Sequence, residues 1–342
     1  MRIGCLQFAA KVGEIKDNIA LADRILANAS PKNLDLLVLP ELAFTGYNFK
    51  SLHAIAPFLE PTAAGPSATW ANATAQKLDC AVVVGYPETV DVSKKWPTSP
   101  EYYNAAVAVS PSGATLANYR KSFLFYTDET WALEGPDGFF EGEFDGIGSV
   151  AMGICMDLNP YKFEAPWSDW EFAYHILHVE ARVAIVSMAW NTREEKETYV
   201  ATPKEPDMET LAYWVARLEP LVRREEKGEI IVVLANRCGV EDDAVYVGTS
   251  TVLGIEEGEV KLYGVLGRGV EELLVVDTEK GPLGKLVSVA RAAESTESEV
   301  STREESVESL LSSGLDEKEG NGGGKSSSAE TSVSPGKSVS PH

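Results

Sequence analysis

The chain has 342 residues, 44% of them hydrophobic and 24% charged, which is enough apolar material for a sizeable folded core. Its formal net charge of -22 at pH 7 argues against nucleic acid or an anionic membrane as the main partner. Its four cysteines are widely spaced and form no CxxC or CxxxC pair, which argues against a zinc site or a disulfide framework.

The first third of the chain alternates short β-like runs with amphipathic helical segments. RIGCLQF (2–8) predicts a strand rather than a signal peptide, because its apolar run is too short. KDNIALADRILANA (16–29) and PSATWANATAQKL (66–78) predict helices, while LDLLVLPE (34–41) and CAVVVGYPE (80–88) predict buried strands. No run reaches the ~20 apolar residues of a membrane span. We therefore expect an intracellular protein, cytoplasmic in the first place, with the nucleus or the mitochondrion as alternatives.

A strand–loop–strand–hairpin pattern occurs twice. Residues 80–121 and 230–265 share it, each with a glycine in the hairpin turn. Two similar halves predict an α/β fold in which two sheets pack face to face between helices, a four-layer αββα sandwich. An ordinary series of hairpins in one mixed sheet is the alternative. Between the halves, residues 191–207 predict a surface loop and METLAYWVARLEPLVRREEKGE (208–229) predicts a helix.

The last part of the chain has a different composition. From residue 288 it is rich in Ser, Glu and Gly and lacks aromatic residues, so it cannot bury a core. We predict one folded domain over residues 1–287 and a disordered acidic tail over 288–342. The tail is expected to be a solvated segment, with a regulatory or partner-binding role as the alternative.

Three chemistry-bearing residues end or closely follow predicted strands. Glu41 closes LDLLVLPE, Lys121 follows ANYR, and Cys155 ends the apolar run SVAMGIC (149–155). The edges formed by strand ends are where α/β sheets place their catalytic groups. A cysteine, a carboxylate and a lysine are also the groups needed to cleave a carbon–nitrogen bond through a thioester. Lys121 considered alone would be assigned to the surface.

The cysteine needs a partner that accepts its proton. His175 and His178 lie three residues apart on a predicted helix, where histidines that pack at an interface are the simpler interpretation. Glu41 is the better base, since burial would raise its pKa towards neutral pH. Glu129 could orient Lys121 or contact the substrate. The Met156 backbone N–H could donate to an oxyanion, as at strand-to-turn elbows generally.

These motifs together resemble the nitrilase superfamily of carbon–nitrogen hydrolases. The resemblance rests on LPE, YRK and GICMD in this order, with ANRCG and VYVGTSTV as the closing strands, and covers roughly residues 1–285. It implies the αββα sandwich, a Glu41–Lys121–Cys155 triad and a supporting role for Glu129. It also implies that no metal or cofactor is needed.

One branch of that superfamily resembles the chain most, the branch that deamidates N-terminal Asn or Gln. PELAFTGYNF, YRKSFLFYTDETWALEG and GICMDLNPYKFEAP carry this resemblance. The wider superfamily often has a histidine two residues after the lysine, where this chain has Phe123. The resemblance implies that the substrates are peptides or proteins that begin with Asn or Gln, and a role in protein degradation that depends on the N-terminal residue.

Such a substrate carries a protonated α-amino group. Asp157 is the candidate to bind it, and the alternative is that Asp157 caps the turn after Cys155. Trp190 and Asn191 end a strand and could line the pocket, although Trp190 could equally belong to the core.

Two other functions remain open from the sequence. One is hydrolysis of a small amide, nitrile or carbamoyl compound, and the other is a non-enzymatic scaffold. The oligomeric state and the preference between Asn and Gln cannot be derived from the sequence.

Overall fold

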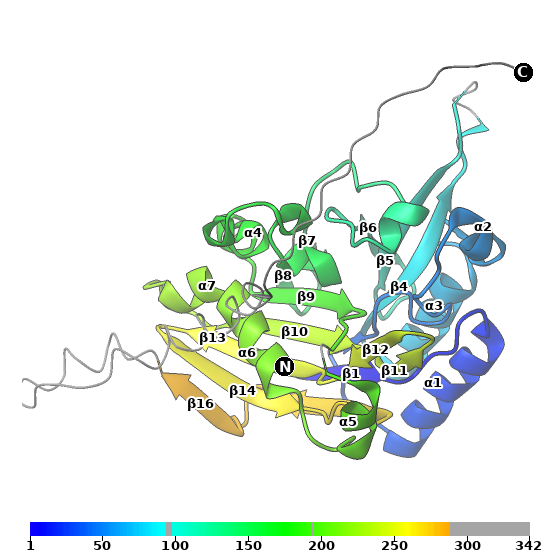
Figure 1. The fold of residues 1–342 in the computed structure, drawn as a ribbon. Coiled ribbons are helices and arrows are strands. Elements are labelled where there is room, and N and C mark those ends of the chain that lie inside the picture. Colours follow the sequence, from blue (N-terminus) through cyan, green and yellow to red (C-terminus); the bar gives the residue numbers. More distant parts are fainter. Residues whose placement is uncertain (94–97, 193, 288–342) are drawn as a thin grey trace, which may run out of the picture. The chain divides into compact units, whose positions relative to one another are not determined.

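The computed structural model describes residues 1–93, 98–192 and 194–287. The predicted tail over 288–342 lies outside the described residues. Two seven-stranded mixed sheets dominate the described part (Figure 1), so the alternative of a single mixed sheet was wrong. Within the described ranges, no helix is long and apolar enough to cross a membrane.

The first sheet has the strand order β15-β1-β2-β4-β5-β6, and β3 pairs with β4. Its strands are β1 (Arg2–Gln7), β2 (Leu36–Val38), β3 (Glu60–Pro61), β4 (Ala81–Val90), β5 (Glu101–Val109), β6 (Thr115–Arg120) and β15 (Glu272–Asp277). The pairs β1–β2 and β2–β4 are parallel, whereas β4–β5 and β5–β6 are antiparallel.

The second sheet has the order β16-β14-β13-β10-β9-β8-β7. Its strands are β7 (Phe140–Phe144), β8 (Gly148–Ile154), β9 (Val183–Met188), β10 (Ile230–Asn236), β13 (Thr251–Glu256), β14 (Glu259–Val265) and β16 (Gly284–Val287). Strands β8, β9 and β10 are parallel. A separate antiparallel hairpin consists of β11 (Cys238–Glu241) and β12 (Ala244–Val247).

The helices follow from local sequence signals. They are α1 (Ile15–Ala29), α2 (Leu52–Ile55), α3 (Pro66–Leu78), α4 (Glu171–His178), α5 (Lys196–Ala201), α6 (Met208–Arg217) and α7 (Glu219–Arg223). Short 3₁₀ turns are η1 (Ala56–Phe58), η3 (Asp128–Thr130), η4 (Cys155–Leu158), η5 (Tyr161–Phe163) and η6 (Trp167–Asp169). The helix expected over 208–229 is in fact two, because Pro220 lies in the first turn of α7 and cannot continue α6.

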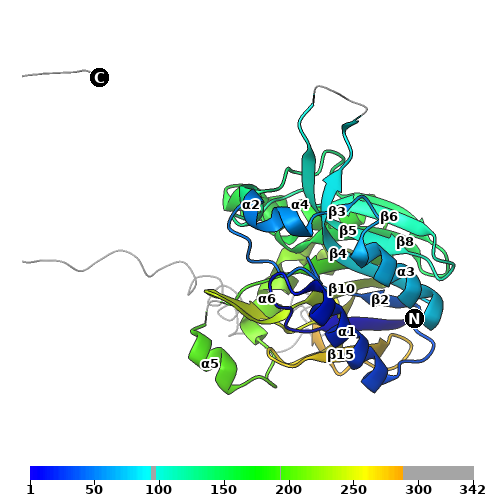
Figure 2. The same cartoon turned by 90° about the vertical axis from the view of Figure 1, so that its right-hand side faces the viewer.

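Successive side chains along a strand point to opposite faces of its sheet, which gives two cores and four layers. In β2, Leu36 and Val38 point to the second sheet, while Leu37 points to the cluster formed with α1 and α3. Figure 2 shows α1 and α3 on the outer side of the first sheet. On the far side, Leu211 and Trp214 of α6 pack against the second sheet. This arrangement is the predicted αββα sandwich, and the fold prediction is confirmed.

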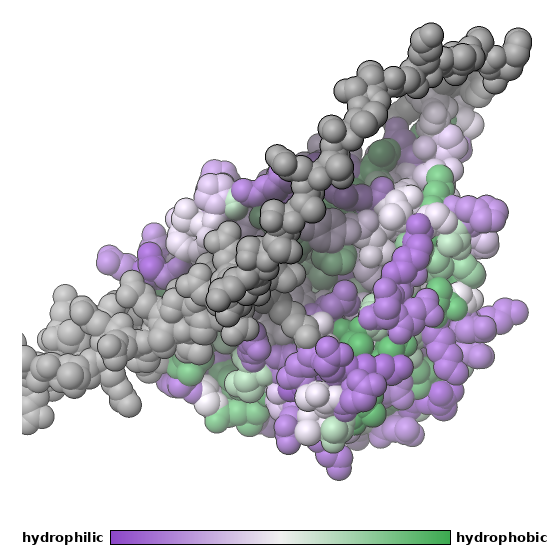
Figure 3. All heavy atoms as spheres, in the orientation of Figure 1, coloured by the Kyte–Doolittle hydropathy of each residue, from purple (hydrophilic) through white to green (hydrophobic). Residues whose placement is uncertain are grey.

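The surface of the folded part is predominantly polar. Figure 3 shows hydrophilic residues distributed over the visible face, with smaller apolar areas between them.

Candidate active site

Glu41 lies in a tight turn directly after β2. The turn passes over β4, where the Leu39 N–H donates to the Val83 carbonyl and the Ala43 N–H to the Gly85 carbonyl. A Cβ at residue 85 would lie 2.7 Å from the Glu41 Cα, so only glycine allows this approach. The local geometry thus turns the Glu41 side chain into the interior, where it is fully buried.

Lys121 is the centre of a buried ionic cluster. Its Nζ donates to Glu41 Oε1 and to Asp128 Oδ2, each at 2.6 Å. Asn104 Nδ2 bridges the same two carboxylates, at 2.7 Å from Glu41 Oε1 and 3.0 Å from Asp128 Oδ1. All four side chains are fully buried, unlike the surface position that Lys121 considered alone would suggest. One cation between two carboxylates leaves the cluster with a surplus of negative charge.

Asp128 is the functional residue that the sequence analysis missed. Glu129, expected either to orient Lys121 or to contact the substrate, is exposed, and its neighbour Asp128 holds the lysine. Asp128 begins the 3₁₀ turn η3, and its Oδ2 also accepts the Phe125 N–H at 3.0 Å. The sequence TDE offered two adjacent acids, and only the direction of this turn selects the first.

Cys155 lies where β8 ends and η4 begins. Its backbone φ of 44° is left-handed, as at a nucleophile elbow, and its side chain is 8% exposed. The Ala189 backbone, just after the neighbouring strand β9, acts to lower the pKa of the Cys155 thiol. The other three cysteines are also free and buried, but Cys155 is the one that shares electrostatic interactions with Glu41, Lys121 and Asp128.

Burial controls the protonation of the cluster. Desolvation, and then the negative charge of Glu41, raise the pKa of Cys155 well above its usual value, while Lys121 opposes the rise. Desolvation also raises the pKa of Glu41, again opposed by Lys121. Burial by itself would lower the pKa of Lys121, but Asp128 and Glu41 raise it, so the lysine stays protonated. A neutral thiol therefore faces a carboxylate whose proton affinity is increased.

Asp157 caps the turn that carries the nucleophile. Its carboxylate accepts hydrogen bonds from the Ile154 N–H at 2.7 Å, the Tyr119 hydroxyl at 2.6 Å and the Phe123 N–H at 2.8 Å. The side chain is fully buried. This geometry supports the capping alternative and gives no support to α-amine binding by Asp157. Met156 lies between Asp157 and Cys155, which places its backbone N–H at the elbow.

Asp157→Asn is expected to destabilise the elbow. The asparagine amide would present N–H groups where three donors converge, at a cost of about 1–3 kcal/mol for each donor left unpaired. We expect a lower Tm and a lower kcat, measured by thermal unfolding and ammonia release.

The pH dependence gives a second readout for Asp157. Burial raises the pKa of Asp157 from 3.8 to about 6, so the folded state binds the proton more tightly than the unfolded state does. Stability from this group is therefore present at low pH and lost as pH rises from 3.8 to about 6. The asparagine variant should lack this loss, and an unchanged pH dependence would contradict the assignment.

Trp190 and Asn191 follow β9 near the cysteine. The half-buried Trp190 ring packs against Tyr213 and Trp214, with centroids 5.6 Å and 5.8 Å away. The Trp190 backbone N–H donates to Asn236 Oδ1 at 2.8 Å. Asn191 forms an isolated β-bridge with Tyr246. The segment therefore runs from Ala189 to the β11–β12 hairpin.

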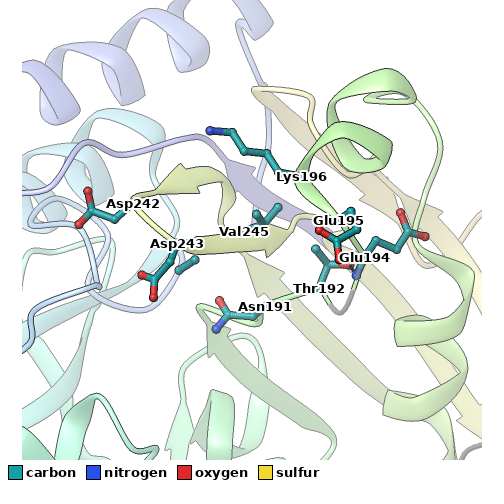
Figure 4. A pocket seen from close by; sticks show the side chains of 9 residues that line it. Asn191, Thr192, Glu194, Glu195, Lys196, Asp242, Asp243 and Val245 are labelled. Atoms are coloured by element: carbon teal, nitrogen blue, oxygen red, sulfur yellow. Dashed lines mark hydrogen bonds between the residues drawn. The ribbon is translucent and has the colours of Figure 1, made fainter.

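Beyond Asn191 the same segment lines an open cavity of about 330 Å³. Figure 4 shows its side chains along the hairpin and the chain that faces it. The lining residues are mainly polar and acidic: Asn191, Thr192, Glu194, Glu195, Lys196, Asp242, Asp243, Ala244 and Val245. None of the three triad residues lines this cavity, so it is separate from the chemistry.

An apolar cluster lines the ends of the strands near the triad. It consists of Leu42, Tyr47, Phe49, Ile55, Leu124, Trp131, Ala132, Ala189 and Tyr246. Its members come from segments far apart in the chain, so only the fold brings them together.

His175 lies outside the buried ionic cluster. His175 Nε2 pairs with the Phe140 carbonyl at 3.1 Å, and its ring packs against Phe139 and Phe172. This is the interface packing expected for it. Across the described ranges, no group of three His, Cys, Asp or Glu side chains has an arrangement that could hold a metal ion.

Comparisons with known proteins identify the family of the chain. The family model described as carbon-nitrogen hydrolase matches residues 2–158. The chain is 35% identical over 295 residues to the protein N-terminal amidase of Schizosaccharomyces pombe, which covers 82% of this chain and 100% of that protein. The chain therefore belongs to the carbon–nitrogen hydrolases of the nitrilase superfamily. Within it, the chain is a homologue of the protein N-terminal amidases.

A second relative and a solved structure extend the comparison. The protein N-terminal amidase of Saccharomyces cerevisiae is 30% identical over 211 residues, 56% of this chain and 45% of that protein. A crystal structure of an N-terminal amidase with an Asn-Glu-Ala peptide has a TM-score of 0.71 at 22% identity, covering 80% of this chain and 96% of the other. At this identity the structural match supports the fold.

Proposed function

We propose that the protein hydrolyses the side-chain carboxamide of an N-terminal Asn or Gln, releasing ammonia and leaving Asp or Glu. The observation that supports this chemistry is the hydrogen bonding of the two Glu41 carboxylate oxygens. Its Oε1 is held by Lys121 and Asn104, while its Oε2 is buried with no hydrogen-bond partner among the described residues. An oriented carboxylate with one free oxygen is suited to move a proton. The substrate class is inferred from the similarity to the protein N-terminal amidases.

The first half-reaction forms a thioester. Glu41 Oε2 takes the proton of the Cys155 thiol, and the sulfur forms a bond to the carboxamide carbon. The oxyanion that results is stabilised by the Lys121 charge and by the Met156 N–H. The tetrahedral species then breaks its carbon–nitrogen bond, and the nitrogen leaves as ammonia with the proton returned by Glu41.

The second half-reaction returns the free enzyme. Glu41 accepts a proton from a water molecule, whose oxygen attacks the thioester carbon. The carbon–sulfur bond breaks and the proton passes from Glu41 to the Cys155 sulfur. The product carries a carboxylate where the carboxamide stood. Asp128 and Asn104 contact no reacting atom in this scheme and act as positioning residues for Lys121 and Glu41.

The test is ammonia release from three matched peptides that begin with Asn, with Gln and with α-acetylated Asn. We expect release from the two peptides with a free amine and at least about tenfold slower release from the acetylated one. Equal rates for acetylated and free Asn would overturn recognition of the N-terminus. Release from small aliphatic amides or nitriles alone would instead support the other hydrolase function.

A further inference from the structure

Tyr47 carries a buried hydroxyl group that the folded chain leaves unused. The side chain is 3% exposed, and no described residue hydrogen-bonds to its Oη. Leaving a buried hydroxyl unpaired costs about 1–3 kcal/mol. A ligand that pairs with the hydroxyl would recover this cost.

The hydroxyl belongs to the same buried space as the triad. The Lys121 ammonium lies 5.8 Å from the centre of the Tyr47 ring, within range of a cation–π contact. Tyr47 also interacts electrostatically with Asp128, Glu41 and Cys155. The ring belongs to the apolar cluster described above, together with Leu42, which follows Glu41, and Ala189, whose backbone acts to lower the pKa of the thiol.

A hydrogen-bond network from a distant part of the chain fixes the position of Tyr47. The Tyr47 N–H donates to Glu241 Oε2 at 3.0 Å, and the Asn48 N–H donates to the same oxygen at 2.8 Å. Glu241 is paired with Arg237 at 2.5 Å, both nearly fully buried. A buried ion pair that clamps the backbone on both sides of the ring leaves the tyrosine little freedom to turn away.

Tyr246 in the same network provides an internal comparison. Its ring meets the Tyr47 ring edge-on, with centroids 6.2 Å apart. Its hydroxyl, however, donates to Glu241 Oε2 at 2.8 Å and is therefore satisfied within the protein. Two neighbouring buried tyrosines thus differ in one respect: the fold uses one hydroxyl and leaves the other free.

The geometry points to Tyr47 as a further catalytic residue, whose hydroxyl donates a hydrogen bond to the oxygen of the reacting carboxamide. This inference rests on the proposed function. Burial raises the pKa of Tyr47 well above its ordinary value, so the phenol keeps its proton and acts as a donor. With Lys121 and the Met156 N–H, it would give the developing oxyanion a third partner.

The variants that test this are Tyr47→Phe and, as the matched control, Tyr246→Phe. Tyr47→Phe should lower kcat on the Asn peptide by roughly 10²-fold, the usual effect of losing one oxyanion donor, with little change in KM. Its Tm should stay the same or rise, because an unpaired buried hydroxyl is removed. Tyr246→Phe should lower the Tm and change kcat much less. Unchanged kcat in Tyr47→Phe, or a loss of kcat that follows a fall in Tm, would overturn the proposal.

A second measurement does not depend on which amide is the substrate. Propionaldehyde forms a hemithioacetal with Cys155: the sulfur bonds to the carbonyl carbon, and the thiol proton moves to the oxygen. Methyl methanethiolsulfonate modifies the free Cys155 thiol, and bound propionaldehyde slows this modification. The affinity for propionaldehyde is measured from this protection, with Cys155→Ala as the blank. Tyr47→Phe should lower the affinity for propionaldehyde at least about tenfold. The rate of thiol modification without propionaldehyde should stay unchanged.

The two measurements separate the two hypotheses. One outcome is that the wild type releases no ammonia from any peptide while Tyr47→Phe still lowers the affinity for propionaldehyde. In that case the proposed peptide substrate is wrong and the role of Tyr47 stands. Equal affinity of both proteins for propionaldehyde would overturn the role of Tyr47 whatever the substrate. A slower thiol modification in Tyr47→Phe would show that the residue acts through Cys155, which also overturns it.

Discussion

Cys155→Ala is expected to lower kcat by roughly 10⁴- to 10⁶-fold, the range seen when a catalytic nucleophile is removed. Glu41 and Lys121 then face a methyl group that cannot form the thioester. The fold should be retained, because alanine keeps the same Cβ at the left-handed backbone position of the elbow. The measurement is ammonia release from the Asn peptide, together with thermal unfolding.

Cys80→Ala is the matched control. Cys80 is a free cysteine that is 1% exposed, but it packs in the outer cluster between the first sheet and α1 and α3. Its removal deletes a similar buried sulfur far from the elbow, so kcat should stay at the wild-type value. Substantial activity in purified Cys155→Ala, or an equal loss in both variants, would contradict the assignment of the nucleophile.

Lys121→Met is expected to have the largest effect on stability and to lower kcat strongly. The variant leaves Glu41 and Asp128 buried without their cation, and removing one partner of a buried ion pair costs about 3–5 kcal/mol. For a domain of this size the Tm should fall by roughly 6–20 °C. The oxyanion also loses its only charged partner, so kcat should fall by at least about 10³-fold.

The pH dependence of the Lys121→Met variant shows whether unpaired buried carboxylates cause its loss of stability. In the wild type Lys121 opposes the rise in the pKa of Glu41, so without the lysine the folded-state pKa of Glu41 rises further. A raised carboxyl pKa gives stability that is present at low pH and lost as pH increases. Lowering the pH from about 7 to about 5 should therefore restore part of the lost Tm.

Lys50→Met serves as the control for the lysine. Lys50 is paired with Asp243 at 3.1 Å, but its side chain is 62% exposed. Such surface pairs contribute about 0–1 kcal/mol, so the variant should unfold close to the wild-type temperature. If Lys121→Met and Lys50→Met lost similar stability, with no recovery at low pH, the buried cluster would not have the energetic role described here.

The sequence by itself determined the sandwich and the triad candidates. Glu41, Lys121 and Cys155 each end or follow an apolar strand, and alternation of apolar residues is a local signal that survives in any tertiary context. The resemblance to the nitrilase superfamily used the same local motifs. These features could be predicted because each one depends on residues that are adjacent in the chain.

The tertiary structure decided which side chains contact each other in the site. Asp128 rather than Glu129 holds Lys121, because a single 3₁₀ turn sets which of two adjacent acids points inward. Asp157 caps the elbow because donors from β6 and the segment after it converge on it. Neither choice leaves a trace in composition or spacing.

The position of Tyr47 depends on the longest-range contacts of the site. Its backbone is held by Glu241, 194 residues further along the chain, and that glutamate is itself held by Arg237. A hydroxyl becomes significant here because burial removes water and the fold offers it no partner. Local sequence can supply a tyrosine, but only the packed structure can leave its hydroxyl free beside the triad.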